Sequence, residues 1–214
     1  MSMIDLHIHS VFSDGELIPS EIARRLSAMN YRAFAITDHV DFSNIEFILS
    51  NLLKIRDFLE EYELKILVGV ELTHIPPRLI GKAVRMARNL GAEIVIVHGE
   101  TIVEPVKEGT NLQAVQEEID ILAHPGLIDE KTAELASENG VYLEITTRKG
   151  HCLTNGHVVK MGKKFGCEFV LNTDSHSPSD FVTKDFAEKV LKGAGIDDPE
   201  EVFKNSFKIA FKNG

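Results

Sequence analysis

Short apolar runs alternate with amphipathic stretches along the whole chain, and the two patterns predict different elements. Seven runs rich in Ile, Val, Leu and Phe predict β-strands at residues 3–8, 33–37, 65–70, 93–97, 119–122, 141–145 and 168–172. The stretches between them, with apolar residues at helical spacing, predict helices at 19–29, 44–62, 78–90, 112–118, 130–139 and 157–165. This alternation predicts parallel strands joined by helical crossovers.

Local signals mark the ends of several predicted helices. Ser43 or Asn44 is suited to cap one helix N-terminus, and Asp129 another. Glycine, which readily takes a left-handed backbone, follows three helices, at Gly91, Gly140 and Gly166. Residues 183–214 predict two amphipathic helices, divided near 193–199. Since no linker or repeat interrupts the pattern, we expect residues 1–214 to form one domain, with 183–214 as helices packed on its outside.

Histidines gather at the ends of the predicted strands. Six of the nine histidines lie at or just beyond apolar runs, namely His7, His9, His39, His98, His124 and His176. A doubly wound sheet would place its site at one switch point, usually with a glycine-rich turn. Here functional-looking residues follow nearly every strand, as in a barrel whose loops meet at one mouth. We therefore expect an α/β fold, a distorted (β/α)7 TIM-like barrel with a metal site at the C-terminal ends of the strands.

Spacing and residue type indicate the chemistry of this site. His7 and His9 are two residues apart, so on a strand they point the same way and can chelate one ion; Asp174 and His176 have the same spacing. Imidazole nitrogen with carboxylate oxygen suits zinc, manganese or iron better than magnesium or calcium. A closed structural zinc site would be rich in thiolates. The chain has only Cys152 and Cys167, not in a Cys-x-x-Cys pair, so we expect open catalytic coordination and free thiols without a role.

Composition narrows the class of protein. At 214 residues, 43% apolar and 26% charged, the chain can bury the core of a soluble globular protein. No apolar stretch approaches the roughly 20 residues that cross a bilayer, and the N-terminus lacks a secretory pattern, so we expect a cytoplasmic protein with no membrane partner. The net charge of -10 argues against nucleic acid as a partner, although bound cations would offset part of it locally. Nothing predicts an oligomeric state.

The same residues resemble a known family. The motifs, in order, are Asp5-Leu6-His7-Ile8-His9-Ser10, Ser13-Asp14-Gly15, Thr37-Asp38-His39, Gly69-Val70-Glu71, His98, Ala123-His124-Pro125-Gly126 and Asp174-Ser175-His176. Over about residues 3–180 they look like the PHP (polymerase and histidinol phosphatase) family. The resemblance implies a distorted (β/α)7 barrel with up to three metal ions at the strand C-termini.

The resemblance also implies a ligand set, position by position. It places a first ion on His7, His9, Glu71 and Asp174, a second on Glu71, His98 and His124, and a third on Asp14, His39 and His176. Glu71 would bridge the first two ions. Some family members have a histidine near the position of Asp14, which leaves the identity of the third metal open.

The expected function is a metal-dependent phosphoesterase that uses a metal-activated hydroxide. A small phosphomonoester fits a chain without Trp and with little room for a substrate domain, and histidinol phosphate is one substrate that the resemblance implies. We expect two to three divalent transition metals (Zn, Mn or Fe) as cofactors. His176 and Asp14 are candidates to assist the leaving group, and Arg148 is the candidate to bind the phosphate.

Other functions remain open at this stage. The same ions can cleave a diester, as in a nuclease, or the barrel can be a non-catalytic RNA-protein subunit. Hydrolysis of a carbon–nitrogen bond, as in amidohydrolase barrels, is a further alternative.

Several other polar residues have simpler interpretations. Asp38 is expected to hydrogen-bond behind a ligand, and Asp5 to orient an imidazole or to accept from a backbone amide. The remaining histidines, His74, His151 and His157, are expected at the surface of loops.

Overall fold

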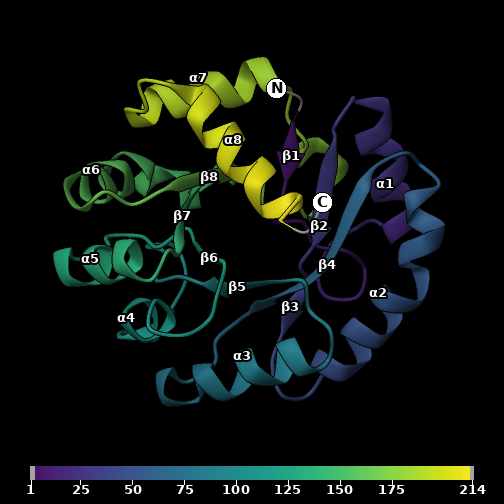
Figure 1. The fold of residues 1–214 in the computed structure, drawn as a ribbon, viewed down its shortest axis with the longest axis horizontal. Coiled ribbons are helices and arrows are strands. Elements are labelled where there is room, and N and C mark those ends of the chain that lie inside the picture. Colours follow the sequence, from purple (N-terminus) through teal and green to yellow (C-terminus); the bar gives the residue numbers. More distant parts are fainter. Residues whose placement is uncertain (1–2, 213–214) are drawn as a thin grey trace.

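The computed structural model describes residues 3–212 and has a barrel of parallel strands at its centre (Figure 1). The strands follow the order β1-β2-β4-β5-β6-β7-β8, and every neighbouring pair is parallel. Their bounds are Ile4–Asp5 (β1), Ala33–Ile36 (β2), Lys65–Leu72 (β4), Ile94–His98 (β5), Ile121–Ala123 (β6), Tyr142–Thr146 (β7) and Phe169–Asn172 (β8). The predicted seven-stranded α/β barrel is confirmed.

One short strand was not predicted. Strand β3, His39–Val40, pairs with the C-terminal half of β4 beside β2. It is two residues long, which is too short to give a periodic pattern. It extends the barrel wall at the C-terminal end of β4 and places His39 opposite Glu71 in the register.

The barrel is nearly closed between β1 and β8, but not by a regular ladder. An isolated bridge joins Ile8 to Ser175. Below it, the side-chain oxygen of Asn172 accepts the backbone N–H of Leu6 at 2.8 Å. Side chains thus supplement sparse backbone pairing along this seam, where the N–H of His9 donates to the carbonyl of Ser175. The N–H groups of His7 and Ile8 donate to the side chains of Asp5 and Thr37, which explains why β1 ends at Asp5 rather than at residue 8 as predicted.

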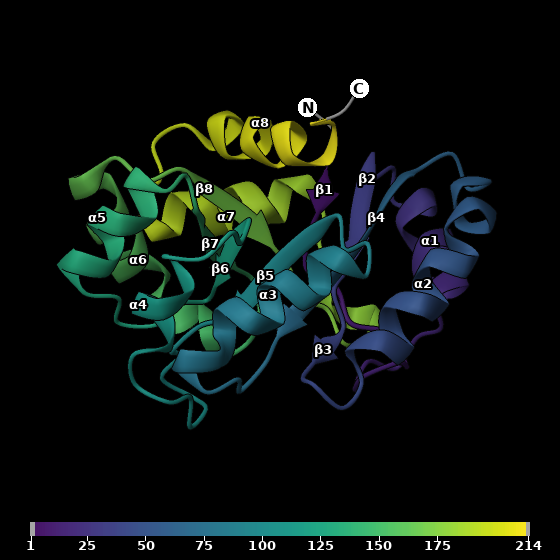
Figure 2. The ribbon, with the colours of Figure 1, turned by 60° about the horizontal axis from the view of Figure 1, so that its bottom comes forward.

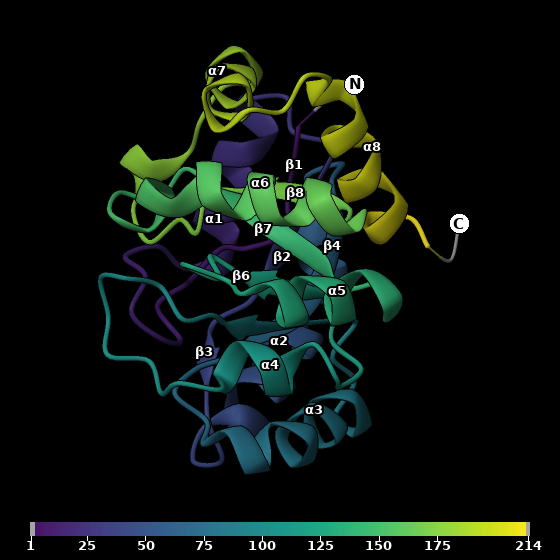
Figure 3. The same ribbon diagram turned by 90° about the vertical axis from the view of Figure 1, so that its left-hand side faces the viewer.

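Helices surround the strands (Figure 1). Their bounds are Pro19–Ala28 (α1), Ile45–Glu60 (α2), Ile80–Asn89 (α3), Thr110–Ala114 (α4), Glu130–Glu138 (α5) and Asn155–Phe165 (α6), with short 3₁₀ helices at Pro77–Leu79 (η1), His151–Thr154 (η2) and Pro178–Asp180 (η3). Helices α4, α5 and α6 pack in sequence along one flank (Figure 3). The predicted helix at 112–118 is wrong at its end: α4 stops at Ala114, because the chain turns back to pair Ile121 with Ile96.

The predicted caps are confirmed in part. Asp129 caps α5 by accepting the backbone N–H of Thr132 at 2.9 Å. Asn44 precedes α2 but makes no cap bond. Its amide instead accepts the N–H of Asp41 and donates to the carbonyl of His39, so it orders the loop that follows His39. The glycines predicted at helix ends, Gly91, Gly140 and Gly166, all have positive φ.

The C-terminal helices α7, Lys184–Ala194, and α8, Pro199–Ala210, lie where the tail pattern predicts helices. Helix α8 crosses one end of the barrel (Figure 2), and its Ile209 and Ala210 pack against the apolar interior. Its Asn205 donates to the carbonyl of Phe169, so it covers the N-terminal ends of the strands. That residues 1–214 form one domain stays a prediction, and residues 1–2 and 213–214 lie outside the described part.

Among residues 3–212, no helix is long and apolar enough to cross a membrane.

The side chains inside the barrel change from apolar to polar along the strands. Near α8 the inner face is apolar, and toward the strand C-termini the same face becomes polar. The change runs from Leu67 to Glu71 on β4, from Ile96 to His98 on β5, from Tyr142 to Glu144 on β7 and from Val170 to Asn172 on β8.

Candidate metal centre

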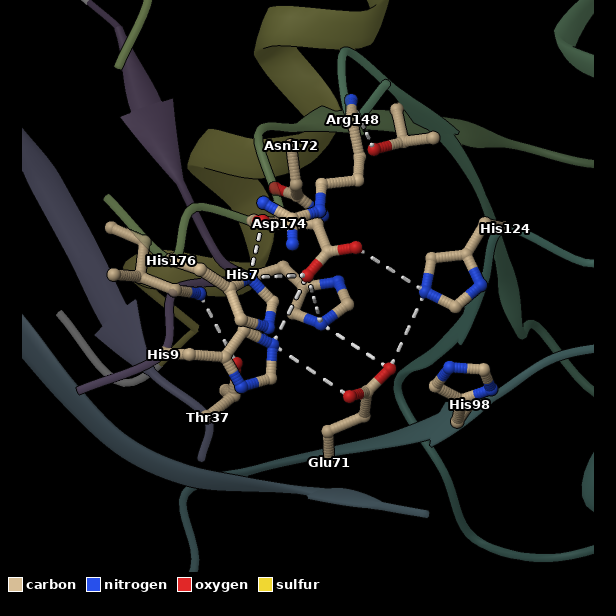
Figure 4. A network of polar contacts seen from close by, with 12 residues as sticks. His7, His9, Thr37, Glu71, His98, His124, Arg148, Asn172, Asp174 and His176 are labelled. Atoms are coloured by element: carbon tan, nitrogen blue, oxygen red, sulfur yellow. Dashed lines mark hydrogen bonds and ion pairs between the residues drawn. The ribbon is translucent and has the colours of Figure 1, made fainter. Parts of the chain in front are cut away.

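Glu71, at the C-terminal end of β4, is the centre of a group of imidazoles (Figure 4). Its Oε1 lies 3.3 Å from Nε2 of His7 and 3.5 Å from Nε2 of His124. Its Oε2 lies 3.7 Å from Nε2 of His9 and 2.6 Å from Nδ1 of His39. The Glu71 side chain is fully buried. One carboxylate thus contacts rings from four different positions of the chain.

Asp174, two residues beyond β8, faces the same group from the other side. Its Oδ1 lies 3.1 Å from Nε2 of His9 and 3.7 Å from Nε2 of His7, and its Oδ2 lies 3.6 Å from Nε2 of His124. Asp174 and His124 have positive φ, at 51° and 25°. Such a backbone costs on the order of 1–3 kcal/mol for a residue with a side chain and persists where surrounding contacts impose it, often at functional sites.

Asp14 lies on the solvent side of the group, in the loop between β1 and α1. Its Oδ1 is 3.3 Å from Nε2 of His176 and 3.6 Å from Nε2 of His39, and its side chain is 59% exposed. Gly15 lets this loop approach the barrel closely, because a Cβ there would lie 2.3 Å from the carbonyl oxygen of His9. The sequence Asp14-Gly15 therefore positions a carboxylate at the mouth.

All nine predicted ligand residues fall into four overlapping groups that can each hold a metal ion. Within a group, the donor atoms all lie within 4.8 Å of one another. The groups are His9, Asp14, His39 and His176; His7, His124 and Asp174; His7, His9 and Glu71; and Glu71, His98 and His124. They share members, so the division of the nine residues among ions stays a prediction.

Donor chemistry in this region fits divalent cations. Several buried polar atoms at the centre have no hydrogen-bond partner within the described residues, namely Nε2 of His7, Nε2 of His9, Oε1 of Glu71 and Oδ1 of Asp174. Buried polar atoms are normally paired, so unpaired nitrogens and oxygens that face one another indicate a missing partner. Asp5, Asp38, Glu71, Glu144 and Asp174 are all buried, whereas no Lys or Arg of residues 3–212 is. A cation among imidazoles and carboxylates would compensate these charges.

Without ions, the carboxylates hold protons on some of these rings. Burial alone would lower the pKa of His39, but Glu71 and Asp14 raise it to about 9. Burial likewise opposes charge on His7, yet Glu144 and Glu71 raise its pKa well above the ordinary value. His9 differs, because burial and the neighbouring His39 lower its pKa to about 3. An ion that binds here must therefore displace protons from some rings but not from all.

We expect metal affinity to rise with pH between 6.5, the ordinary pKa of histidine, and about 9, the pKa of His39. The rise is about tenfold per pH unit for each proton released. The raised pKa of His39 stabilises the metal-free protein below pH 6.5, and this contribution is lost as pH rises through about 9. Zinc titration by calorimetry at pH 6.5, 7.5 and 8.5, in buffers of different ionisation enthalpy, measures both affinity and protons released. Equal affinity at all three values would contradict this expectation.

Asp38 lies outside the four candidate groups, and the hydrogen bonds of its side chain go to two serines rather than to a proposed ligand. Its carboxylate accepts the backbone N–H and the hydroxyl of Ser10, each at 2.7 Å, and the hydroxyl of Ser13 at 2.7 Å. Burial raises its pKa despite these bonds. The network orders the start of the loop that carries Asp14.

For Asp5, the structure favours backbone contacts over an imidazole. Its carboxylate accepts the backbone N–H of His7 at 3.2 Å and both the N–H and the hydroxyl of Thr173, at 3.2 and 2.5 Å. Burial raises its pKa to about 6. Asp5 therefore joins β1 to the segment that follows β8, through contacts to His7 and to the residue that precedes Asp174.

Two residues beside the centre were not predicted, and the expectation for a third was wrong. Glu144 on β7 contacts His7, and Glu104 contacts His98, with Oε2 3.1 Å from Nε2. His151 was expected at the surface but is 7% exposed, because η2 turns it inward. Its ring lies 4.3 Å from that of His124, and its Nε2 is 3.4 Å from Oε1 of Glu104.

The other two histidines expected in loops differ from each other, and for His157 that expectation was wrong because it lies in α6. His74 is half exposed, as expected. His157 is partly buried, and its Nε2 lies 2.8 Å from the carbonyl oxygen of Ile128. Neither side chain belongs to the groups around Glu71.

Arg148, just beyond β7, extends toward the same group of residues (Figure 4). Its Nη1 donates to Oδ2 of Asp180 at 3.2 Å, and that oxygen also accepts the backbone N–H of His176 at 2.9 Å. Arg148 also lines a cavity of about 380 Å³ together with Lys149 and Asp180. The predicted contact with phosphate stays a prediction, and the arginine also ties β7 to the loop of His176.

Comparison of the sequence with known proteins places the chain in a family. The PHP domain profile matches residues 5–118. The chain belongs to the PHP domain family. This PHP protein is 51% identical over 199 residues to the uncharacterized protein MJ1295 of Methanocaldococcus jannaschii, covering 92% of the chain and 91% of that relative.

Two further comparisons are more distant. The PHP protein is 26% identical over 195 residues to the DNA polymerase/3'-5' exonuclease PolX of Bacillus subtilis, covering 81% of this chain but only 34% of that protein. Its fold is similar to that of histidinol phosphate phosphatase from Lactococcus lactis, solved with zinc, L-histidinol and phosphate. The TM-score is 0.66 at 19% identity, covering 90% of this chain and 93% of the other. This likeness shows the fold.

Proposed function

We propose that this PHP protein is a metal-dependent phosphoesterase that hydrolyses a small phosphomonoester, with a histidinol-phosphate-like ester as the substrate to test first. The observation that carries the proposal is the group of nine His, Asp and Glu residues around Glu71, with buried donor atoms that lack partners. Family membership and the similar fold of a histidinol phosphate phosphatase support it.

The proposed cofactors are two to three divalent ions, Zn, Mn or Fe. We assign His7, His9, Glu71 and Asp174 to the first ion, Glu71, His98 and His124 to the second, and Asp14, His39 and His176 to the third. When bound, such ions activate water as a nucleophile and neutralise charge on the phosphate.

The chain's own residues would orient the ester and assist its leaving group. His176 and Asp14 lie 3.3 Å apart at the exposed side of the group. The carboxylate of Asp14 has a pKa lowered to about 2, since His176 and His39 outweigh its partial burial. This pair is positioned to assist the departing alkoxide: without the third ion a proton shared by the two side chains could reach the leaving oxygen, whereas with that ion bound both side chains would be ligands and hold no proton.

We expect Arg148→Ala to raise KM for the ester roughly tenfold or more with a smaller change in kcat, because a charged hydrogen bond to phosphate contributes about 1.5–3 kcal/mol. Initial rates over a range of ester concentrations measure this. Lys149→Ala is the matched control for loss of a nearby cation. Asp180→Ala tests the alternative role: it removes the oxygen that accepts both the His176 N–H and Arg148 but leaves the Arg148 side chain, so an equal effect of Asp180→Ala would refute phosphate binding.

Elemental analysis of the purified protein, combined with phosphate release, tests the function. We expect two to three metals per chain and release of phosphate from a small monoester, stimulated by added manganese or zinc. Full metal content with turnover of bis(p-nitrophenyl) phosphate alone would overturn the monoesterase in favour of a diesterase. Absence of metal would instead overturn the metal-dependent mechanism itself.

A further inference from the structure

Glu144, in the middle of β7, has a carboxylate outside the nine proposed ligands. Its side chain is fully buried. Oε1 lies 2.8 Å from Nδ1 of His7 and accepts Nδ2 of Asn172 at 2.8 Å. Oε2 accepts the backbone N–H of His124 at 3.1 Å. One carboxylate therefore contacts the ring of one proposed ligand and the backbone of another.

The hydrogen bonds around Glu144 determine which nitrogen of His7 carries the proton. The backbone N–H of Leu6 donates to Oδ1 of Asn172, so the other arm of that amide is its NH₂ group, which donates to Glu144. Because the oxygens of Glu144 accept from these amides, Nδ1 of His7 is a donor. The lone pair of a neutral His7 then lies on Nε2, which has no partner among the described residues and lies 3.3 Å from Glu71.

Three N–H groups converge on this side chain, and only a carboxylate accepts all three. In a Glu144→Gln variant the side-chain amide would have only one oxygen. With that oxygen toward His7, its NH₂ group would face the backbone N–H of His124. In the reverse orientation the NH₂ group would face Nδ1 of His7 and favour a proton on Nε2, which then cannot bind metal. Each orientation disturbs one proposed ligand.

The backbone of His124 has an uncommon conformation that its surroundings must hold in place. Its φ of 25° is uncommon for a residue with a side chain. The bond to Oε2 of Glu144 holds the N–H of this strained residue. A buried carboxylate is costly unless it is paired, so the three N–H groups and the ions of the proposed metal centre would also compensate the charge of Glu144.

We propose that Glu144 is a positioning residue of the metal centre, which keeps Nε2 of His7 free for an ion and fixes the backbone of His124. The inference rests on the ion sites of the proposed function but not on its substrate. Removing such an outer carboxylate typically costs about 10–100-fold in metal affinity.

A measurement on the wild-type protein tests the tautomer directly. In ¹⁵N-histidine-labelled, zinc-loaded protein, NMR of the ring nitrogens is expected to show His7 with a proton on Nδ1 and none on Nε2. The His7→Gln variant assigns the resonances by their disappearance. A proton on Nε2 of His7, or zinc on its Nδ1, would overturn the proposal without any requirement that a Glu144 variant folds.

The matched variants test the energetic role. We expect Glu144→Gln to bind zinc about 10–100-fold more weakly, measured by competition with a chromophoric chelator. Asp120→Asn is the control, because Asp120 is a buried acid that accepts the backbone N–H of Val95 at 2.9 Å, at the barrel end covered by α8. Its zinc affinity should stay within about twofold of wild type, because an outer carboxylate affects metal affinity through its contact with a metal ligand, and Asp120 contacts none of the proposed ligands.

Native zinc affinity in a folded Glu144→Gln protein would overturn the inference, as would an equal loss in Asp120→Asn. Neither measurement uses an ester. A protein that binds zinc as expected but hydrolyses no phosphomonoester would therefore refute the proposed function while supporting the role of Glu144.

Discussion

Glu71→Gln is expected to lower phosphate release by roughly a thousandfold or more and to leave the protein with little bound metal. The side chain is fully buried, and both of its oxygens face imidazoles. Nε2 of His7 and Nε2 of His124 lie at one oxygen, and Nδ1 of His39 at the other. An amide keeps the volume of the side chain but removes its charge and one acceptor, so it cannot bridge two cations.

His98→Ala provides the contrast for this variant. His98 belongs to one candidate group only, with Glu71 and His124, whereas Glu71 belongs to two. We therefore expect His98→Ala to lose mainly one ion and Glu71→Gln to lose two. Metal content per chain, with phosphate release from the same sample, measures the difference. Wild-type metal content and turnover in Glu71→Gln would refute the assignment of Glu71 as a bridging ligand.

Much of the fold could be predicted because its elements are local patterns. Apolar runs located the strands of the barrel, and helical spacing located the helices between them. Strand β3 has two residues and no period, so it was missed. The end of β1 was wrong because its seam with β8 is closed by side chains such as Asn172, which no periodicity encodes.

Most candidate ligand positions could also be located in the sequence, since the six histidines follow apolar runs and parallel strands bring their C-terminal ends together. Asp14 follows no apolar run and came only from the family resemblance, and the assignment of the nine residues to ions stays a prediction. The residues around them were harder. Glu144 lies 137 positions from His7 in the chain, so no local motif joins the two. Strand alternation was the one available signal, because Glu144 shares the inward face of β7 with Tyr142. Glu104 lies in a loop without a period, so nothing in the sequence placed it beside His98.

The positions of the proposed ligands link metal binding to closure of the barrel. His7 and His9 follow β1, whereas Asp174 follows β8, and the seam between these strands lacks a regular ladder. Asp174 lies within 3.1 Å of His9 across the seam. An ion shared by these side chains would connect the first and last strands at the point where backbone pairing is sparse. Binding energy for the ion then becomes stability of the fold.

Removal of metal is therefore expected to destabilise the protein substantially. A ligand present at about 1,000 times its Kd stabilises the folded state by about 4 kcal/mol, which for a chain of this size corresponds to a Tm change of roughly 8–16 °C. Thermal unfolding at pH 8, before and after treatment with a chelator, measures the change, and restored zinc should reverse it. Hydrogen exchange should quicken at the N–H groups of Leu6 and His9, which bond across the seam. His98→Ala is the control, because it retains the residues that join β1 to β8 and should keep much of the zinc-dependent stability. An unchanged Tm after complete removal of metal would show that the seam is closed by side chains such as Asp5 and Asn172 without help from ions.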